Sequence, residues 1–184
     1  MEISAAQKDV RTTFLGGFPG QLVSSAIWFL SAASLTWLSF KAAVLVLVAG
    51  GFFIFPLAQL ILRLMGRPAS LPKRHPMNGL AVQIAFTLPL TLPLVLMVTV
   101  SRHSWFYPAF MIALGAHYLP FVFLYGMWQF GLLSGLLVAS GTVLGLYFPA
   151  ASIFGAWLTP ALLLVFAFVG RQAALKDLPH AQSA

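Results

Sequence analysis

Four long stretches of this sequence contain no Asp, Glu, Lys or Arg, and they constrain the fold more than any other feature. They cover residues 12–40, 42–62, 75–101 and 103–170. A helix needs about 20 apolar residues to cross the hydrocarbon core of a bilayer. Each of the first three stretches is long enough for one such helix, and the fourth, with 68 residues, is long enough for three. The pattern therefore predicts a membrane protein that crosses the bilayer several times.

The low charge content excludes the main alternatives. Only 7% of the 184 residues are charged, whereas an ordinary soluble domain has roughly 25%. A soluble globular protein needs more polar and charged residues on its surface than this composition provides. A disordered chain is also excluded, because disordered chains contain far fewer apolar residues than the 60% found here. The net charge of +7 arises because the chain has only three acidic residues beside ten basic ones. Because the basic residues are scattered rather than gathered on one face, we expect no nucleic-acid partner.

We predict an all-α fold, in which residues 1–184 form a single transmembrane domain with a bundle of six transmembrane helices. Gly126 and the Phe148-Pro149 step divide the last stretch, because neither continues a helix well. The Gly50-Gly51 pair indicates either a close helix contact or a local break in the second helix. A basic loop, residues 66–77, separates the second helix from the third. The predicted helices cover about residues 19–39, 42–65, 78–100, 104–125, 127–148 and 152–170.

The distribution of Lys and Arg predicts the orientation of the bundle. Cytoplasmic loops of membrane proteins carry an excess of these residues. With the N-terminus in the cytoplasm, only Lys41 and Arg102 lie outside. We therefore expect both termini to be cytoplasmic. The basic residues that then lie inside are Lys8, Arg11, Arg63, Arg67, Lys73, Arg74, Arg171 and Lys176.

The predicted spans hold neutral polar side chains but no acid, which disfavours a transporter coupled through carboxylates. In the orientation above, Gln59, Gln83, His117 and Tyr118 all lie toward the cytoplasmic half of the bundle. One hypothesis is a polar cavity open to the cytoplasm, in which these side chains contact a small-molecule solute. The other is packing between helices, where amides and imidazoles form hydrogen bonds. The sequence leaves both hypotheses open.

No metal site, cofactor or catalytic residue is predicted. A zinc site needs at least three protein ligands. The chain has no cysteine, and three of its histidines, His75, His103 and His180, fall in loops or tails away from the depth of His117. Ser24 and Ser25 could supply a nucleophile with His117 as its base, but no motif orients them and no carboxylate is near.

The basic loop places Arg67, Lys73 and Arg74 at the cytoplasmic surface of the membrane. Basic residues there attract anionic lipid headgroups, by about 1 kcal/mol each. A phosphate or nucleotide site is the sharper alternative, but no glycine-rich cradle accompanies these cations. We therefore predict that the loop contacts membrane lipid.

Small residues mark a packing face on the fifth predicted helix, residues 127–148. Two GxxxG patterns, which permit helices to approach closely, pair Gly131 with Gly135 and Gly141 with Gly145. We expect these glycines to serve contacts within the bundle. A homo-oligomer that forms through the same glycines is the alternative.

Several short segments resemble a family of small bacterial multi-pass membrane proteins that is known only as a domain of unknown function. The resemblance covers nearly the whole chain, and it implies a location in the bacterial cytoplasmic (inner) membrane. It supplies neither an activity nor a site. The segments are PGQLVSSAIW (19–28), GFFIFP (51–56), HPMNG (75–79) and GAHYLPF (115–121).

These observations favour a small transporter-like or channel-like protein with a neutral polar cavity open to the cytoplasm. The first alternative is a non-catalytic membrane partner or sensor that interacts through residues 127–148. The second is a membrane-embedded enzyme that modifies lipid, which the missing catalytic motif makes the weakest of the three.

Overall fold

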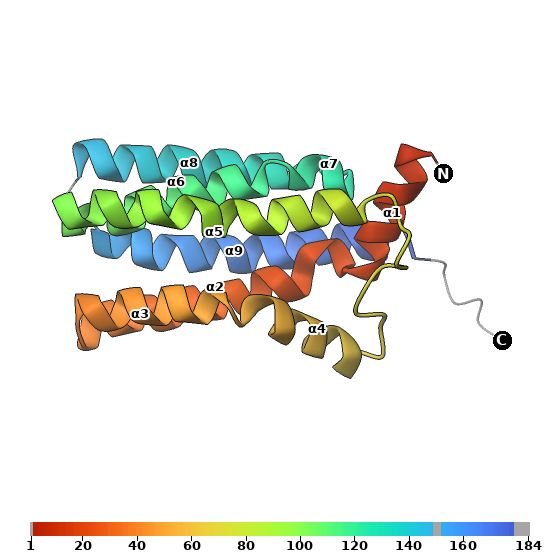
Figure 1. The fold of residues 1–184 in the computed structure, drawn as a ribbon, viewed down its shortest axis with the longest axis horizontal. Helices are drawn as coiled ribbons and strands as arrows, with labels where there is room; N and C mark the ends of the chain where they lie inside the picture. The colour runs from red at the N-terminus through yellow and green to blue at the C-terminus, as the bar shows by residue number, and fades with distance from the viewer. Residues whose placement is uncertain (1, 149–151, 179–184) are drawn as a thin grey trace.

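The computed structural model describes residues 2–148 and 152–178, and within them all regular structure is helical. The helices form an elongated bundle in which most axes run along the long direction of the molecule (Figure 1). The predicted all-α class is therefore confirmed. In chain order the elements are α1 (Ile3–Thr13), η1 (Leu15–Gly17), α2 (Phe18–Trp37), α3 (Phe40–Gly51), α4 (Ile54–Leu64), α5 (Asn78–Ser101), η2 (His103–Trp105), α6 (Phe106–Tyr118), α7 (Phe121–Tyr125), α8 (Gln129–Tyr147) and α9 (Ser152–Leu175).

Four helical stretches are long and apolar enough to cross a membrane, and the pair α3 and α4 makes a fifth if it is counted as one bent span. The protein is thus an all-helical chain with several helices suited to a membrane. The helix α2 has 20 residues, five of which are Ser or Thr, and it is not among these stretches. The four stretches are Asn78–Ser101, His103–Tyr125, Gln129–Tyr147 and Ile153–Leu175.

The helix predicted over residues 42–65 is divided into α3 and α4, whose axes differ by 56°. Two features of the sequence explain the break. Pro56 has no N–H to donate to the carbonyl of Phe52, and Gly50 with Gly51 lowers the helix propensity just before it. Gly50 also faces Ile27, whose Cγ2 would lie 2.6 Å from an added Cβ. The glycine pair therefore marks both a close contact and a break.

The predicted helix over residues 104–125 is also interrupted. It consists of η2, α6 and α7, and the helical pattern is broken at Leu119 and Pro120. Proline again removes one backbone donor, here the one that would reach the carbonyl of Ala116. The stretch still serves as one candidate span from His103 to Tyr125.

The N-terminal segment forms a helix, α1, although the first helix predicted from the sequence begins only at residue 19. α1 crosses the end of the bundle where α7 and α9 finish (Figure 1). It packs there through Ala6 and Val10, each 1% exposed. The last helix also runs further than predicted, to Leu175. Arg11 of α1 pairs with Asp177 just after α9, so the two ends of the described chain meet at the same end of the bundle.

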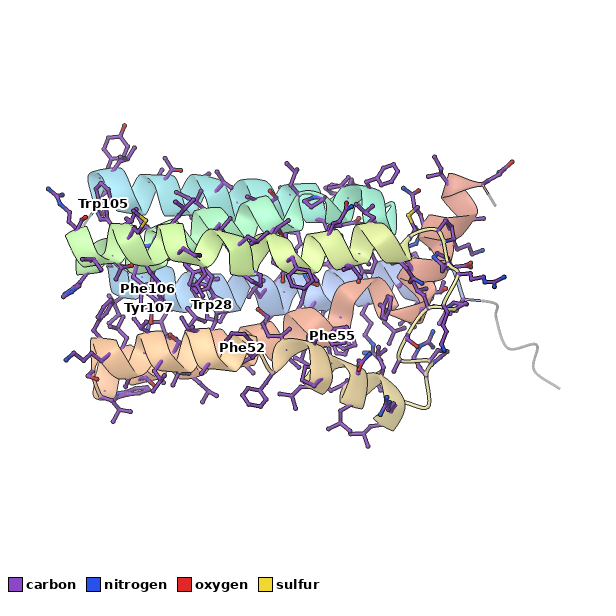
Figure 2. The ribbon with its side chains drawn as sticks, viewed as in Figure 1. Trp28, Phe52, Phe55, Trp105, Phe106 and Tyr107 are labelled. Atoms are coloured by element: carbon purple, nitrogen blue, oxygen red, sulfur yellow. The ribbon has the colours of Figure 1, made fainter. Side chains whose placement is uncertain are left out.

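Two pairs of helices, α6 with α8 and α2 with α9, form the centre of the bundle, while α5 packs mainly on α6, and α3 packs on α2. Buried aromatic side chains fill the centre, and Figure 2 shows Trp28, Phe106 and Tyr107 inside it. The hydroxyl groups of Tyr107 and Ser31 are 2.7 Å apart. Phe52 and Phe55, in contrast, are exposed near the break between α3 and α4. In a bilayer, lipid covers such outward apolar faces.

Candidate functional site

Two of the four predicted solute-contacting residues, His117 and Tyr118, lie side by side on α6 but have different partners. His117 Nδ1 is 2.8 Å from the hydroxyl oxygen of Thr87 on α5. Tyr118 is buried, and its ring stacks on Phe130 of α8 at 6.1 Å between centroids. His117 thus forms a hydrogen bond between helices, as the packing hypothesis expects.

The other two predicted residues do not join them around one cavity. Gln59 donates a hydrogen bond of 3.3 Å to the carbonyl oxygen of Ala69, in the basic loop. Gln83 is exposed on α5, one turn before Thr87. The expectation that the four share a single polar cavity is therefore not met, because a common depth does not put residues on facing sides of their helices. Whether any of them contacts a ligand stays a prediction.

Ser24 and Ser25, the candidate nucleophiles of a lipid-modifying enzyme, are both buried in the contact between helices. Ser25 donates a hydrogen bond of 2.8 Å to the carbonyl oxygen of Pro160 on α9, and Ser24 is buried beside it on α2. His117, the candidate base, is hydrogen-bonded to Thr87 on α5. In the described residues, no group of three His, Cys, Asp or Glu side chains could hold a metal ion.

The basic loop divides its cations between two environments. Arg67 is partly buried and donates a hydrogen bond of 2.7 Å to the carbonyl oxygen of Thr12, at the end of α1. Lys73 and Arg74 are exposed. Arg67 therefore holds the loop against the N-terminal helix, and contact with lipid headgroups stays a prediction that fits Lys73 and Arg74 best.

Two of the four GxxxG glycines on α8, Gly141 and Gly145, lie at the contact with α6. A Cβ on Gly141 would lie 2.7 Å from the carbonyl oxygen of Pro108, and one on Gly145 would lie 3.3 Å from the Cβ of Pro108. Gly131 lies near Val122, and Gly135 faces open space. The expected contact within the bundle is thus present at Gly141 and Gly145. A homo-oligomer through the four glycines stays a prediction.

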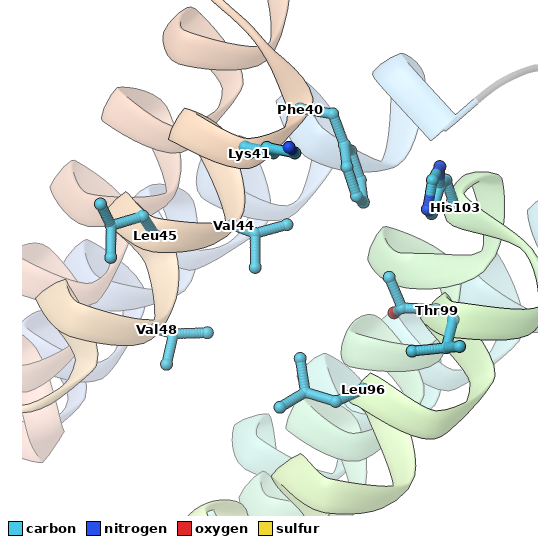
Figure 3. A pocket seen from close by; sticks show the side chains of 9 residues that line it. Phe40, Lys41, Val44, Leu45, Val48, Leu96, Thr99 and His103 are labelled. Carbon is cyan, nitrogen blue, oxygen red and sulfur yellow. The ribbon is translucent and has the colours of Figure 1, made fainter.

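A groove between α3 and α5, which we call the α3–α5 groove, has a volume of about 380 Å³. It lies at the end of the bundle away from α1, and the four predicted solute-contacting residues do not line it (Figures 1 and 3). The hollow is thus at the opposite end from the predicted polar cavity, and its walls are apolar. It is lined by Phe40, Lys41, Val44, Leu45, Val48, Leu96, Thr99, Val100 and His103.

The polar groups of the α3–α5 groove gather at one end. His103 stacks on Phe40 with ring centroids 5.1 Å apart, and Lys41 extends toward this pair (Figure 3). The hydroxyl of Thr99 donates a hydrogen bond of 2.7 Å to the carbonyl of Val95 in its own helix. The groove is therefore an apolar slot with a single cation at its mouth. From the sequence, Lys41 is predicted only to lie on the outer side of the membrane.

A second hollow of about 450 Å³ is lined by Val98, Ser101, Arg102 and Trp105. Residues 98 and 102 are on the side of α5 opposite to residues 96 and 100, so this hollow is separate from the α3–α5 groove. The Arg102 guanidinium lies 5.3 Å from the centroid of the Trp105 ring. Such a cation–π contact holds Arg102 on that side of α5.

Comparison with known proteins finds one family. A family model described as a family of unknown function, DUF7010, matches residues 3–172. No curated protein and no solved structure matches the chain. The function must therefore be argued from the geometry of the chain itself.

Proposed function

The chain belongs to DUF7010, a family of unknown function, and from its geometry we propose that it is a six-span membrane protein that binds a membrane-resident amphiphile. The ligand enters the α3–α5 groove sideways from the bilayer. Both termini are cytoplasmic in this proposal, and the groove opens near the outer surface of a bacterial cytoplasmic membrane. The observation that carries it is the apolar hollow between two helices at the edge of the bundle.

Three observations support six spans. Helix α2 is 20 residues long and packs along the candidate span α9. The bent pair α3 and α4 connects the outer end of α2 with the basic loop. The Arg11–Asp177 pair joins the two ends of the described chain, which supports an even number of crossings. The excess of Lys and Arg at this end supports a cytoplasmic location for it.

Single cysteines test this topology directly, because the chain has none of its own. With Ser39→Cys or Ser104→Cys, we expect a membrane-impermeant maleimide to label intact cells. With Lys73→Cys or Lys176→Cys, we expect labelling only after the membrane is opened. An odd number of spans would put Lys8→Cys and Lys176→Cys on opposite sides, which would contradict the proposal.

The size and walls of the α3–α5 groove fit the tail of an amphiphile. Ligand sites in proteins have volumes of about 300–1,000 Å³, and this groove has about 380 Å³. Its walls are mostly Val and Leu side chains, and the hydroxyl of Thr99 is already bonded within its helix. A polar solute would find few partners there, whereas an acyl chain would lose no hydrogen bond on entering.

The groove therefore favours a lipid-like ligand over the soluble solute expected from the glutamines and His117. A channel or transporter for such a solute would need those side chains around one water-filled path. Gln59 instead bonds a loop carbonyl, and His117 bonds Thr87. A role as a partner protein through α8 receives no particular support, because Gly141 and Gly145 pack against α6.

Filling the groove with a bulky side chain tests the proposal. Val48→Trp places an indole in the α3–α5 groove, whereas Leu94→Trp adds the same group on α5 at a position that is 63% exposed. In vesicles that contain a photoreactive acyl lipid, we expect Val48→Trp to lose most of the labelling on α3 and α5, and Leu94→Trp to keep it.

Peptide mapping by mass spectrometry locates the label, and unfolding followed by tryptophan fluorescence checks that both variants fold. Equal labelling of the wild type and of folded Val48→Trp would show that lipid only coats the surface. That result would overturn the proposed function.

A further inference from the structure

We propose that the ligand of the α3–α5 groove is an anionic amphiphile, whose acidic headgroup is held by Lys41 while its acyl chain lies between α3 and α5. This inference rests on the proposed function and names the class of its ligand. It follows from three features of this end of the bundle: the distribution of charge, the placement of Lys41 at the mouth, and the start of α3 beside it.

The charge at this end has no counterpart within the chain. The only acids in the sequence are Glu2, Asp9 and Asp177, and all three lie at the other end of the bundle. Asp177 pairs with Arg11, and Asp9 lies 3.6 Å from His75. Lys41 therefore has no acidic side chain to pair with near the groove. An anion from outside the chain would complement it.

Lys41 lies at the mouth of the groove, where its amino group could bind the headgroup of a lipid. Lys41 follows Phe40, whose ring stacks on His103 with 5.1 Å between the centroids, and both of these rings line the groove. Its amino group extends toward this stack (Figure 3). A lysine at the edge of a membrane span extends its charged group to the interface while its stem stays on apolar surface. The headgroup would thus sit at the mouth and the tail along Val44 and Val48.

The start of α3 adds to the attraction for an anion. α3 begins at Phe40, and the side chain of Ser39 caps only the N–H of Ala42. The remaining N–H groups of the first turn give this end of the helix a partial positive charge. Lys41 lies within that turn, so its charge and that of the helix end act on the same place. Other charged side chains are absent from the described lining of the groove.

Two kinds of molecule share this chemistry: an anionic phospholipid and a free fatty acid. Both carry an acyl chain and a negative charge at one end. Recognition through one lysine depends on that charge and not on the shape of the headgroup, since no second charged side chain lines the groove. A zwitterionic lipid with the same acyl chains would fit the apolar walls of the groove, but its headgroup carries no net negative charge to pair with Lys41.

Photolabelling of the purified full chain in vesicles tests the inference. The probes are photoreactive phosphatidylglycerol, phosphatidylcholine with identical chains, and a photoreactive fatty acid, each at the same low fraction in an unlabelled bilayer. We expect the two anionic probes to label α3 and α5 about fivefold more than phosphatidylcholine, the effect of one basic residue near the headgroup. Lys41→Gln should remove this preference, and Lys41→Arg should keep it.

Arg102→Gln is the matched control. It removes one positive charge at the same end of the bundle but lines the other hollow, so the preference should survive. Lys41→Gln must unfold at the same temperature as the wild type, because its exposed side chain forms no hydrogen bond or ion pair with the residues that the structure describes. Labelling by only one of the two anionic probes would support the inference and identify the source of the charge.

Other outcomes separate the two proposals. If phosphatidylcholine labels the groove as well as phosphatidylglycerol does and Val48→Trp blocks both, the groove binds lipid but the choice of an anion is wrong. If Lys41→Gln and Arg102→Gln lower the preference equally, the effect comes from surface charge in general and the inference is overturned. If Val48→Trp changes nothing with any probe, the proposed function itself fails.

Discussion

Replacing Gly16 with alanine is expected to destabilise the folded protein by about 3 kcal/mol or more. Gly16 has a φ of 63°, a left-handed conformation that costs an ordinary residue about 1–2 kcal/mol. An added Cβ would also overlap the carbonyl oxygen of Gly170 in α9. Because this neighbour is backbone, α9 would have to shift, and such overpacking costs about 1–3 kcal/mol.

The contact is reciprocal, which allows its two components to be separated. A Cβ on Gly170 would lie 2.6 Å from the carbonyl oxygen of Gly16, but Gly170 is within a regular helix. Gly170→Ala should therefore lose only the overpacking component, about 1–3 kcal/mol. Thermal unfolding in detergent, followed by the fluorescence of the five tryptophans, measures both variants.

Gly20→Ala is the control for these two variants. Gly20 lies in α2, and nothing is within 4 Å of an added Cβ, so alanine should be neutral or stabilise the helix by up to about 1 kcal/mol. If Gly16→Ala unfolded with the wild type, η1 and α9 would not approach each other as closely as described. If all three variants lost stability equally, the contact between Gly16 and Gly170 would not be responsible for the loss.

Much of the fold follows from the positions of the charges. Because Lys41, Arg63 and Arg102 lie at the boundaries of long apolar stretches, the starts and ends of most helices were predicted to within a few residues. The sequence alone does not distinguish the break between α3 and α4 from a close contact between helices, since Gly50-Gly51 is compatible with both. The helix α1 was missed because its segment is polar, and it is held in place by Ala6 and Val10 packing on the bundle.

The candidate site could not be predicted in the same way. Depth in the membrane follows from counting residues, but the direction of a side chain also depends on how each helix is rotated, and successive residues differ by about 100°. Gln59 and Gln83 therefore share a depth with His117 without sharing a cavity. The walls of the α3–α5 groove, Val44 and Val48 among them, have the same residue types as lipid-facing positions. Of the two basic residues that the sequence places at this end, Lys41 and Arg102, only Lys41 lines the groove.

Replacing Arg11 with methionine is expected to lower the stability of the protein by about 2–3 kcal/mol, as for the loss of hydrogen bonds from a charged group. Arg11 serves two partners at once. Its Nε pairs with Asp177, and its Nη1 donates a hydrogen bond of 2.6 Å to the carbonyl oxygen of Tyr125. That carbonyl is at the end of α7, where the last carbonyl groups have no partner within the helix. Methionine keeps the apolar stem and removes both interactions.

A double-mutant cycle with Asp177→Asn separates the two interactions. Asparagine still accepts a hydrogen bond from Arg11, so Asp177→Asn alone should cost about 1 kcal/mol, and its effect should largely vanish when Arg11 is already methionine. Lys8→Met removes a positive charge from the exposed side of α1 and should be near neutral. If Lys8→Met instead cost as much as Arg11→Met, charge at the lipid surface would hold α1 in place. The proposed role of Arg11 in joining the two ends of the described chain requires a loss of stability that is specific to Arg11→Met and coupled to Asp177→Asn.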